Sequence, residues 1–186
     1  MMNSTFLKQI QSNWTLFLDR DGVINQRLHG DYVKSISEFY FLKDVPEAVA
    51  ILNRFFERII VVTNQQGVGK GLMTNSQLDI INEYMRHKIQ EAGGHIDKIY
   101  SCTDLSTDPM NCRKPKTTMA EWAKHDFPEI DFSRSVMIGD TETDLLFGQN
   151  CGMYTVLIDP EIRNISADAI FASLIEFAIT VQKNAN

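Results

Sequence analysis

Residues 15–25, TLFLDRDGVIN, place two acidic side chains directly after a short apolar run. The run itself, residues 15–18, has the length and the composition of a buried β-strand. Asp19 and Asp21 follow it with Arg20 between them, and because Asp is a common turn residue, an ordinary turn is one interpretation. Two like charges so close together repel, which raises the pKa of each, and a divalent cation would remove the repulsion. We therefore expect a functional site at this strand end rather than a simple turn.

The composition is that of a globular protein of ordinary hydrophobicity. The chain has 186 residues, of which 44% are hydrophobic and 23% are charged, and this predicts a single domain over residues 1–186. The net charge of −6 argues against a general nucleic-acid binder, which needs a basic surface. A local positive pocket for a small anion remains compatible with this charge.

Targeting and redox features predict a cytoplasmic protein. No apolar run approaches the length needed to cross a bilayer, and residues 1–13 lack the apolar core of a signal peptide. The three cysteines, Cys102, Cys112 and Cys151, give no disulfide framework, so we expect free thiols in a reducing compartment. We also expect a monomer that binds neither membranes nor nucleic acid.

Short apolar runs alternate with helical patterns along the chain. Strands are expected at residues 15–18, 59–62, 95–102, 135–140, 154–159 and 169–173. Helices are expected at residues 44–58, 74–94, 116–127, 141–152 and 174–183. This alternation predicts an α/β fold, a doubly wound and mostly parallel sheet with helices on both faces. No separate cap domain fits between the first two strands.

Local signals support several of these boundaries. Asp44 is placed to cap the first helix, and Thr74 with Gln77 has the spacing of a capping box. Residues 26–42, which follow the acidic pair, fit neither helix nor strand. A loop of that length within a compact domain is usually functional, so we expect it to border the site. The C-terminal residues 184–186 are expected to fray.

Polar side chains follow four of the expected strands. They are Asp19 and Asp21, then Thr63, Asn64 and Gln65, then Arg113 and Lys114, and finally Asp140 with Asp144 one helical turn later. Ligands bind outside the carboxyl ends of an open parallel sheet, so these side chains are expected to meet. Together they supply a nucleophile, an acid, metal ligands and anion donors, which are the components that phosphoryl transfer requires.

Four motifs in this order, DRDGV, VVTNQ, RKP and GDTETD, resemble those of the haloacid dehalogenase (HAD) superfamily of phosphatases over roughly residues 15–158. The resemblance implies a Rossmann-like fold and a Mg²⁺ cofactor. It implies that Asp19 is the nucleophile that forms an aspartyl-phosphate. It further implies that Asp21 is the general acid and base, that its backbone carbonyl also binds Mg²⁺, and that Asp140 completes the metal site.

The same resemblance assigns the phosphate-binding residues. Thr63 donates to the phosphoryl group with Asn64 alongside, and Lys114 holds the nucleophile and the phosphate together. Thr63 and Asn64 could instead cap a strand end, and a Lys beside a Pro turn is usually solvated. Asp144 is either a residue that supports the site or an acid favoured by the helix N-terminus, and both interpretations remain open.

The stretches LFLDRDGVIN, HGDYV, VVTNQQGVGKG and CRKP are most similar to the family of D-glycero-D-manno-heptose 1,7-bisphosphate 7-phosphatases. Histidinol-phosphate phosphatases and other small-molecule HAD phosphatases are the alternative. The finer resemblance implies that His29, Tyr32, Gln65, Gln66 and Arg113 contact the sugar phosphate. Arg113 is the candidate for a phosphate at the non-reacting end, because a guanidinium binds phosphate through two parallel hydrogen bonds.

The chain departs from this family at its zinc loop. The four ligand positions hold Cys102, Asp104, Met110 and Cys112, and a thioether and a carboxylate are poor partners for a structural zinc. We therefore expect no zinc, and a loop packed through Leu105 and Met110. Close relatives also carry a Lys after the fourth motif's first Asp, where this chain has Thr141.

Three other functions fit parts of the pattern. A receiver domain also uses an acidic cluster, a Thr and a Lys, but its phosphorylated Asp ends an internal strand rather than the first. An inactive scaffold conflicts with the intact carboxylates and Lys114. A nucleic-acid end phosphatase conflicts with the acidic net charge.

Overall fold

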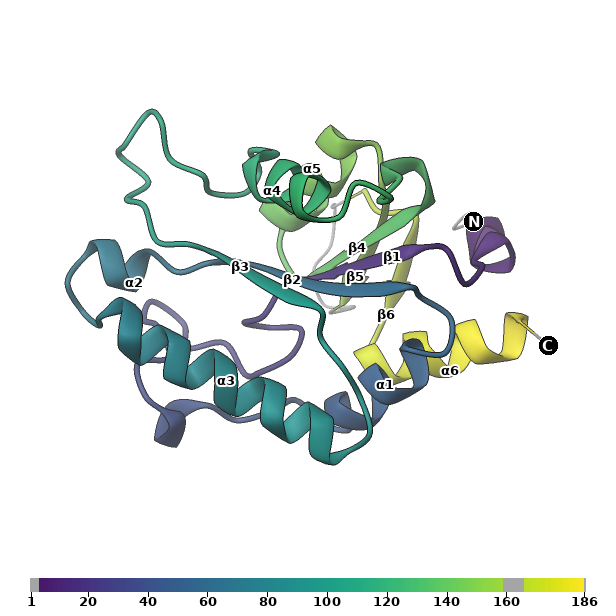
Figure 1. The fold of residues 1–186 in the computed structure, drawn as a ribbon, viewed down its shortest axis with the longest axis horizontal. Helices are drawn as coiled ribbons and strands as arrows, with labels where there is room; N and C mark the ends of the chain where they lie inside the picture. Colours follow the sequence, from purple (N-terminus) through teal and green to yellow (C-terminus); the bar gives the residue numbers. More distant parts are fainter. Residues whose placement is uncertain (1–3, 159–165, 186) are drawn as a thin grey trace.

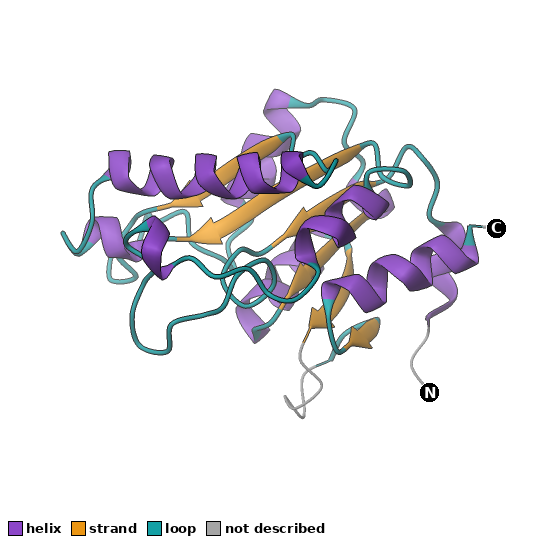
Figure 2. Ribbon diagram, turned by 90° about the horizontal axis from the view of Figure 1, so that it is seen from below, coloured by secondary structure: helices purple, strands orange, loops and turns teal. Residues whose placement is uncertain are grey.

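A parallel sheet forms the centre of the molecule. The computed structural model describes residues 4–158 and 166–185. Its strands are β1 (Thr15–Leu18), β2 (Arg58–Asn64), β3 (Lys98–Cys102), β4 (Ser135–Gly139), β5 (Tyr154–Ile158) and β6 (Ala169–Phe171). They pair in the order β3-β2-β1-β4-β5-β6, and every neighbouring pair is parallel. The predicted doubly wound α/β sheet is confirmed, and it is entirely parallel over these strands (Figures 1 and 2).

Helices cover both faces of this sheet. They are α1 (Val45–Leu52), α2 (Gln66–Gly69), α3 (Asn75–Glu91), α4 (Thr118–Asp126), α5 (Glu142–Cys151) and α6 (Leu174–Asn184). The helices α1, α3 and α6 lie on one face, and α4 and α5 lie on the other (Figure 1). The short helix α2, which follows β2 directly, was not expected from the sequence.

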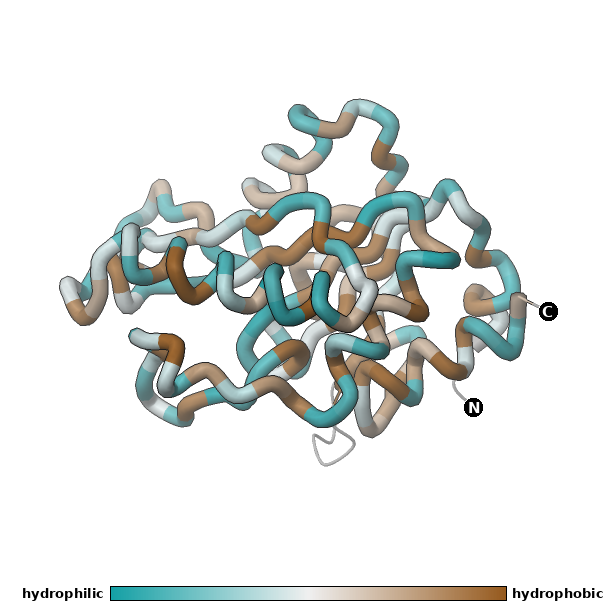
Figure 3. Tube along the Cα trace, turned by 60° about the horizontal axis from the view of Figure 1, so that its bottom comes forward, coloured by the Kyte–Doolittle hydropathy of each residue, from teal (hydrophilic) through white to brown (hydrophobic). Residues whose placement is uncertain are grey.

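Side chains of the central strands alternate between two hydrophobic layers. In β1, Leu16 and Leu18 pack with residues of α1, α3 and α6, whereas Phe17 packs with residues of α4 and α5. In β4, Val136 packs in the layer of α1, α3 and α6, and Met137 packs in the layer of α4 and α5. A strand buried on both faces needs a continuous apolar sequence, which is why the strands could be located. Figure 3 colours the chain by hydropathy, and hydrophobic stretches alternate there with hydrophilic ones along the trace.

Some predicted helix ends are confirmed and others are wrong. Thr74 and Gln77 form the expected capping box at the start of α3. Asp44 precedes α1, but its backbone is left-handed (φ 57°) and its side chain makes no capping hydrogen bond. Helix α1 ends at Leu52, six residues earlier than predicted, because the chain turns there to enter β2. Residues 184–186 were expected to fray; α6 includes Asn184, Ala185 lies beyond the helix, and residue 186 lies outside the described residues.

Residues 26–42 form the expected loop, with one short 3-10 helix, η2 (Ile36–Glu38). The loop is tied back to the strand end that it leaves, because Asn25 and Phe41 form an isolated antiparallel bridge. It therefore crosses near the carboxyl end of β1.

The N-terminal segment is part of the packed structure. A 3-10 helix, η1 (Ser4–Gln9), contacts α6, and Phe6 stacks on Tyr154 with ring centroids 4.6 Å apart. Trp14 stacks on the same ring at 5.6 Å. In the described part of the chain, no helix is both long and apolar enough to span a membrane. The end of the fifth predicted strand, Asp159, lies outside the described residues.

Candidate active site

The carboxyl ends of β1 and β4 bring three predicted acids together. Asp19 follows β1, Asp140 follows β4, and Asp144 lies in the first turn of α5. One carboxylate oxygen of each lies within 4.8 Å of the others. Because β1 and β4 pair directly, residues far apart in the sequence reach one point at this edge of the sheet.

Two glycines make this close approach possible. Gly22 has a φ of +102°, and a Cβ there would lie 2.0 Å from a carboxylate oxygen of Asp140. A Cβ on Gly139 would lie 2.1 Å from the Cβ of Asp144. The glycines of the DRDG and GD motifs therefore serve to let the acids converge.

Lys114 neutralises part of this acidic cluster. Its buried ammonium lies 2.7 Å from Asp19 Oδ1 and 2.6 Å from Asp144 Oδ1, and it donates to the carbonyl of Val62 at 2.8 Å. Burial alone would lower the pKa of Lys114, but the two carboxylates outweigh it and raise that pKa. Lys114 is therefore a charged group held between the two acids.

Asp19 and Asp140 retain protons more readily than ordinary carboxyls. Burial and then the charge of Asp144 raise the pKa of Asp19 to about 6, against the opposing charge of Lys114. Burial and then the charge of Asp19 raise the pKa of Asp140 to about 7. A divalent cation between them would reverse both effects, because it stabilises the ionised forms.

Asp21 behaves in the opposite way. Burial would raise its pKa, but the charge of Arg20 and hydrogen bonds from Asn25, Arg20 and Gln65 hold that pKa below 3.8. Arg20 is fully buried and lies 3.0 Å from Asp21 Oδ2. The expectation that the two neighbouring acids raise each other's pKa therefore holds for Asp19 only. Arg20, which separates them in the sequence, is the counter-charge of Asp21.

The oxygen atoms expected to hold Mg²⁺ converge on a single cationic group, the guanidinium of Arg27. Its Nη2 lies 2.8 Å from the carbonyl oxygen of Asp21, 2.6 Å from Asp140 Oδ1 and 3.5 Å from Asp19 Oδ2. One carbonyl and two carboxylates are the hard oxygen donors that Mg²⁺ prefers. The residues present therefore fit the metal, and Asp19, Asp21 and Asp140 would hold it.

A cavity of about 420 Å³ opens beside this cluster. Its walls include the predicted catalytic residues Asp19, Asp21, Thr63 and Lys114. Four expected substrate residues also line it, namely His29, Tyr32, Asn64 and Arg113. The sequence motifs therefore meet in one concave site, as the strand-end argument predicts.

Gln65 and Gln66, which were expected to contact substrate, lie outside the lining of this cavity. The amide nitrogen of Gln65 donates to Asp21 Oδ2 at 2.7 Å and to Thr63 Oγ1 at 2.8 Å. Gln66 accepts a hydrogen bond from the backbone nitrogen of Ser106. Both side chains are buried and support neighbouring residues instead of facing the cavity.

Asn64 has a supporting contact besides its place in the cavity wall. Its Oδ1 accepts from the backbone nitrogen of Lys114 at 3.0 Å, and its amide donates to the backbone carbonyl of the same residue. The end of β2 thereby fixes the segment that carries the ammonium group.

The cavity lining carries cations besides Lys114, namely Arg27, Lys70 and Arg113. Arg113 Nη1 is buried and has no hydrogen-bond partner among the described residues. The Lys70 ammonium lies 5.5 Å from the centroid of the Tyr32 ring, and both residues line the cavity. Neither Arg27 nor Lys70 was singled out as a site residue from the sequence. A positive residue in a loop directly after the acidic motif was the available signal for Arg27.

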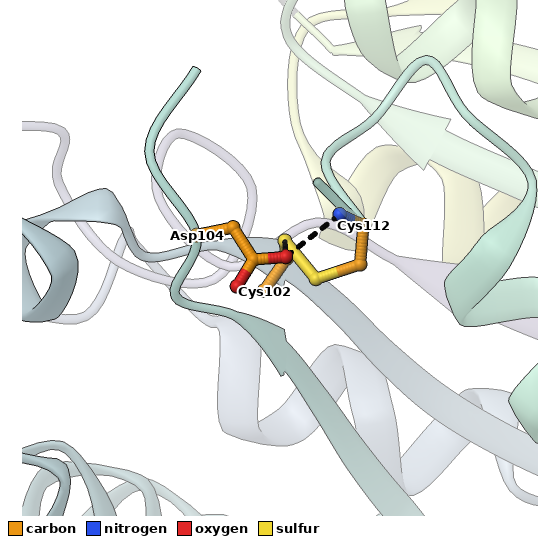
Figure 4. Close-up of side chains that lie close together, drawn as sticks. All are labelled: Cys102, Asp104 and Cys112. Atoms are coloured by element: carbon orange, nitrogen blue, oxygen red, sulfur yellow. Dashed lines mark hydrogen bonds between the residues drawn. A yellow bond between two sulfur atoms is a disulfide. The ribbon is translucent and has the colours of Figure 1, made fainter. Parts of the chain in front are cut away.

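The cysteines correct the expectation of free thiols. Cys102, at the end of β3, and Cys112 form a disulfide with their Cα atoms 5.6 Å apart (Figure 4). The carboxylate of Asp104 accepts a hydrogen bond from the backbone nitrogen of Cys112 at 2.9 Å. Cys151 remains a free thiol. The number of cysteines alone does not predict this bond, because it forms only when the loop after β3 folds back to the end of that strand.

The donor set of this loop does not fit a structural zinc. Disulfide sulfurs are not thiolates, and Asp104 then offers the one remaining anionic group of the four aligned positions. Met110 is 87% exposed, so the expectation that it packs the loop is wrong, whereas Leu105 is 39% exposed and its side chain lies beside Gly69 of α2. The disulfide and the Asp104 hydrogen bond hold the loop in place.

Comparison with known proteins identifies the family. The HAD-hydrolase-like family model matches residues 111–169. The D-glycero-alpha-D-manno-heptose-1,7-bisphosphate 7-phosphatase of Mycobacterium bovis is 35% identical over 90% of this chain and 91% of its own length. The D-glycero-D-manno-heptose-1,7-bisphosphate 7-phosphatase of Chlorobaculum tepidum is 34% identical over 80% of each chain.

A solved structure agrees with these sequence relatives. The D,D-heptose 1,7-bisphosphate phosphatase of B. bronchiseptica, determined with magnesium and phosphate, superimposes with a TM-score of 0.84 at 25% identity. The match covers 92% of this chain and 99% of that one. The chain therefore belongs to the HAD superfamily, and within it to the family of phosphatases that contains these heptose bisphosphate phosphatases.

Proposed function

We propose that this phosphatase removes the 7-phosphate from D-glycero-D-manno-heptose 1,7-bisphosphate. The names of relatives that match most of the chain support this substrate. The observation that carries the chemistry is the contact of Lys114 with Asp19 beside the convergent oxygens of Asp21 and Asp140. Magnesium bound there would supply a Lewis acid for the phosphoryl oxygens.

In the proposed reaction, a carboxylate oxygen of Asp19 attacks phosphorus, and the bond from phosphorus to the sugar oxygen breaks. Asp21 donates its proton to the departing sugar oxygen. The charge of the bound phosphate raises the pKa of Asp21 and so favours its protonation before this step. Lys114 and Thr63 stabilise the phosphoryl oxygens through charge and hydrogen bonding.

The second half of the reaction regenerates the enzyme. The carboxylate of Asp21 takes a proton from water, which attacks the phosphorus of the aspartyl-phosphate. The bond between phosphorus and Asp19 breaks, and inorganic phosphate leaves. Hydrogen bonds from Gln65 and Asn25 keep the Asp21 carboxylate oriented through both steps.

Two cations in the cavity lining favour a bisphosphate over histidinol phosphate. Arg113 and Lys70 line the cavity, and Arg113 has a buried nitrogen that lacks a partner among the described residues. These cations would attract a second phosphate and repel the ammonium group of histidinol. His29 and Tyr32 line the same wall and would contact the sugar.

We further propose that the full chain acts as one monomeric domain in the cytoplasm, without zinc and without a nucleic-acid or membrane partner. The Cys102–Cys112 disulfide removes the thiol argument for a reducing compartment, so the localisation rests on the substrate. A phosphorylated sugar does not cross a bilayer unaided, and its phosphatase must share its compartment. The net charge of −6 supports the absence of a nucleic-acid partner. The Cys102–Cys112 disulfide takes up both sulfurs that would serve as thiolate ligands, which supports the absence of zinc.

The test is a panel of kcat/KM values with Mg²⁺ for both anomers of heptose 1,7-bisphosphate, heptose 7-phosphate, histidinol phosphate and hexose phosphates. We expect the highest kcat/KM for heptose 1,7-bisphosphate. Arg113→Gln, which removes the charge and keeps a polar side chain, should lower kcat/KM for the bisphosphate more than for heptose 7-phosphate. A preference for histidinol phosphate, or equal losses in the variant, would contradict the proposed substrate.

A further inference from the structure

Arg27 contacts the same three groups that are expected to hold Mg²⁺. Its Nη2 approaches Asp21 O, Asp140 Oδ1 and Asp19 Oδ2, and its Nε donates to Asp21 O at 3.2 Å. The carbonyl of Asp21 thus receives two N–H groups from one guanidinium. No sequence motif assigned any role to this residue.

A guanidinium and a divalent cation cannot use these oxygens at the same time. Both need the lone pairs that point to the centre of the cluster, and two cations at that spacing repel each other. Mg²⁺ must therefore displace Arg27 before it can take the ligands. Displacement breaks hydrogen bonds to charged groups, which are among the stronger ones in proteins, so it weakens the apparent affinity for the metal.

The side chain of Arg27 has room to leave. It is 34% exposed, it lines the cavity, and it comes from the loop of residues 26–42 rather than from the sheet. Besides Lys114, the cluster therefore has a second positive group near it, first Arg27 and then the metal.

We propose that Arg27 is an internal counter-ion of the metal site that competes with Mg²⁺ and sets its affinity. This inference rests on the proposed magnesium site and adds a residue that determines when the site fills. Before the metal binds, Arg27 holds the carbonyl and the two carboxylates in a common arrangement. With the metal bound, those groups no longer need the arginine.

The test measures Mg²⁺ binding by calorimetry on protein treated with chelator, in the absence of substrate. Arg27→Gln should bind Mg²⁺ about tenfold or more tightly than the unmodified protein, because no competing charged hydrogen bonds must break. Lys70→Gln is the matched control. It removes one positive charge from the same cavity, but its ammonium packs on the Tyr32 ring, so its Mg²⁺ affinity should change less than about threefold.

Thermal unfolding gives a second and independent result. In chelator, Arg27→Gln should have a lower Tm than the unmodified protein, because the Asp21 carbonyl and Asp140 lose their cationic partner and Asp19 keeps only Lys114. Saturating Mg²⁺ should remove most of that difference. Should Arg27→Gln not fold, Arg27→Lys takes its place, since a lysine keeps the charge but loses the planar pair of donors.

The outcomes separate this inference from the proposed function. Equal Mg²⁺ affinities in the unmodified protein and Arg27→Gln, or equal gains in Arg27→Gln and Lys70→Gln, overturn the competition by Arg27 and leave the magnesium site standing. Failure of both proteins to bind Mg²⁺ overturns both ideas. The kcat/KM panel tests the substrate independently of both of these results.

Discussion

The ammonium nitrogen of Lys114 lies 2.7 Å from Asp19 Oδ1, which joins two buried residues that are 95 positions apart in the chain. The same nitrogen lies 2.6 Å from Asp144. A buried ion pair forms favourably when its geometry is good and its remaining donors are satisfied, and here the ammonium reaches two carboxylates and a carbonyl. This contact is what keeps Asp19 available as an anion in spite of its burial.

Replacement of the proposed nucleophile is the most direct test of the chemistry. Asp19→Asn should lower kcat by about three orders of magnitude or more, because an amide is a poor nucleophile toward phosphorus. Phosphate release from heptose bisphosphate measures the rate, and mass spectrometry of quenched enzyme detects the phosphorylated residue. A variant that still accumulates a covalent phosphate would show that another residue is the nucleophile.

Asp144 has two contacts that different substitutions can separate. Its carboxylate accepts from the backbone nitrogen of Thr141 at the start of α5 and also pairs with Lys114. Asp144→Asn keeps an oxygen for the cap but loses the charge beside Lys114, so kcat should fall by about tenfold to a hundredfold. Thr141→Ala removes a capping side chain and should lower the free energy of unfolding by about 1 kcal/mol, with a smaller effect on kcat. Equal losses of kcat in the two variants would favour a purely structural role for Asp144.

The strands and the catalytic core could be predicted because their signals are local. An apolar run buried on both faces fixes each strand, and parallel strands end at one edge, so Asp19 and Asp140, which directly follow β1 and β4, had to meet. The capping box at Thr74 depends on four consecutive residues and was equally visible. Features that depend only on consecutive residues, such as a strand or a capping box, could therefore be predicted from the sequence.

Features that depend on how a loop returns could not be derived. Arg27 reaches the acids only because residues 26–42 fold back over β1, and the sequence does not encode that path in any short pattern. The contact of Cys102 with Cys112 likewise needs the loop to close on β3. Gln65 was assigned to substrate, but its amide turns toward Asp21, which a motif position does not specify.

The acids of the metal site predict an unusual pH dependence. In the folded protein the pKa of Asp19 is raised to about 6 and that of Asp140 to about 7, against an ordinary value of 3.8. Between about pH 4 and about pH 7 the folded state therefore binds more protons than the unfolded state, so these groups lose stabilisation as pH rises through that window. Below about pH 4 both carboxyls are protonated in the folded and the unfolded state, so their stabilising contribution is fully present.

Thermal unfolding in chelator across this range measures the effect, with Asp140→Asn as the comparison. The variant cannot titrate at that position, so its Tm should fall less steeply with pH than that of the unmodified protein. Mg²⁺ competes with protons for the same oxygens, so the rise in Tm on adding Mg²⁺ should grow with pH. A metal-induced shift that is constant with pH would contradict the raised pKa values.

Asp21 is expected to combine a catalytic and a structural effect. Asp21→Asn should slow breakdown of the aspartyl-phosphate, so rapid-quench samples should contain more phosphoenzyme than those of the unmodified protein. Mg²⁺ affinity should change little, because the backbone carbonyl is the expected ligand. The fully buried Arg20 loses its charged partner, which should lower the free energy of unfolding by about 1.5–3 kcal/mol. A near-normal turnover rate would contradict the acid and base role.

The Cys102–Cys112 disulfide predicts a defined thiol count. Denatured protein that has not been reduced should react with a thiol reagent at Cys151 alone, and reduction should expose Cys102 and Cys112 as well. The cross-link closes a loop with a sequence separation of 10, so Cys112→Ser should lower the free energy of unfolding by about 2–3 kcal/mol on chain-entropy grounds. Because Cys112 lies two residues before Lys114, the variant should also reduce kcat.

Cys151→Ser is the matched control for that experiment, since it removes a thiol that lies outside the disulfide. Cys151 is partly buried against the cluster around α4 and α5, so Cys151→Ser should lower the unfolding free energy by less than Cys112→Ser does. A reductant should then lower the stability of the control further but not that of Cys112→Ser. Three reactive thiols before reduction would mean that the loop is held without the cross-link. In that case Asp104, which accepts from the backbone nitrogen of Cys112, would be the remaining polar contact between the two ends of the loop.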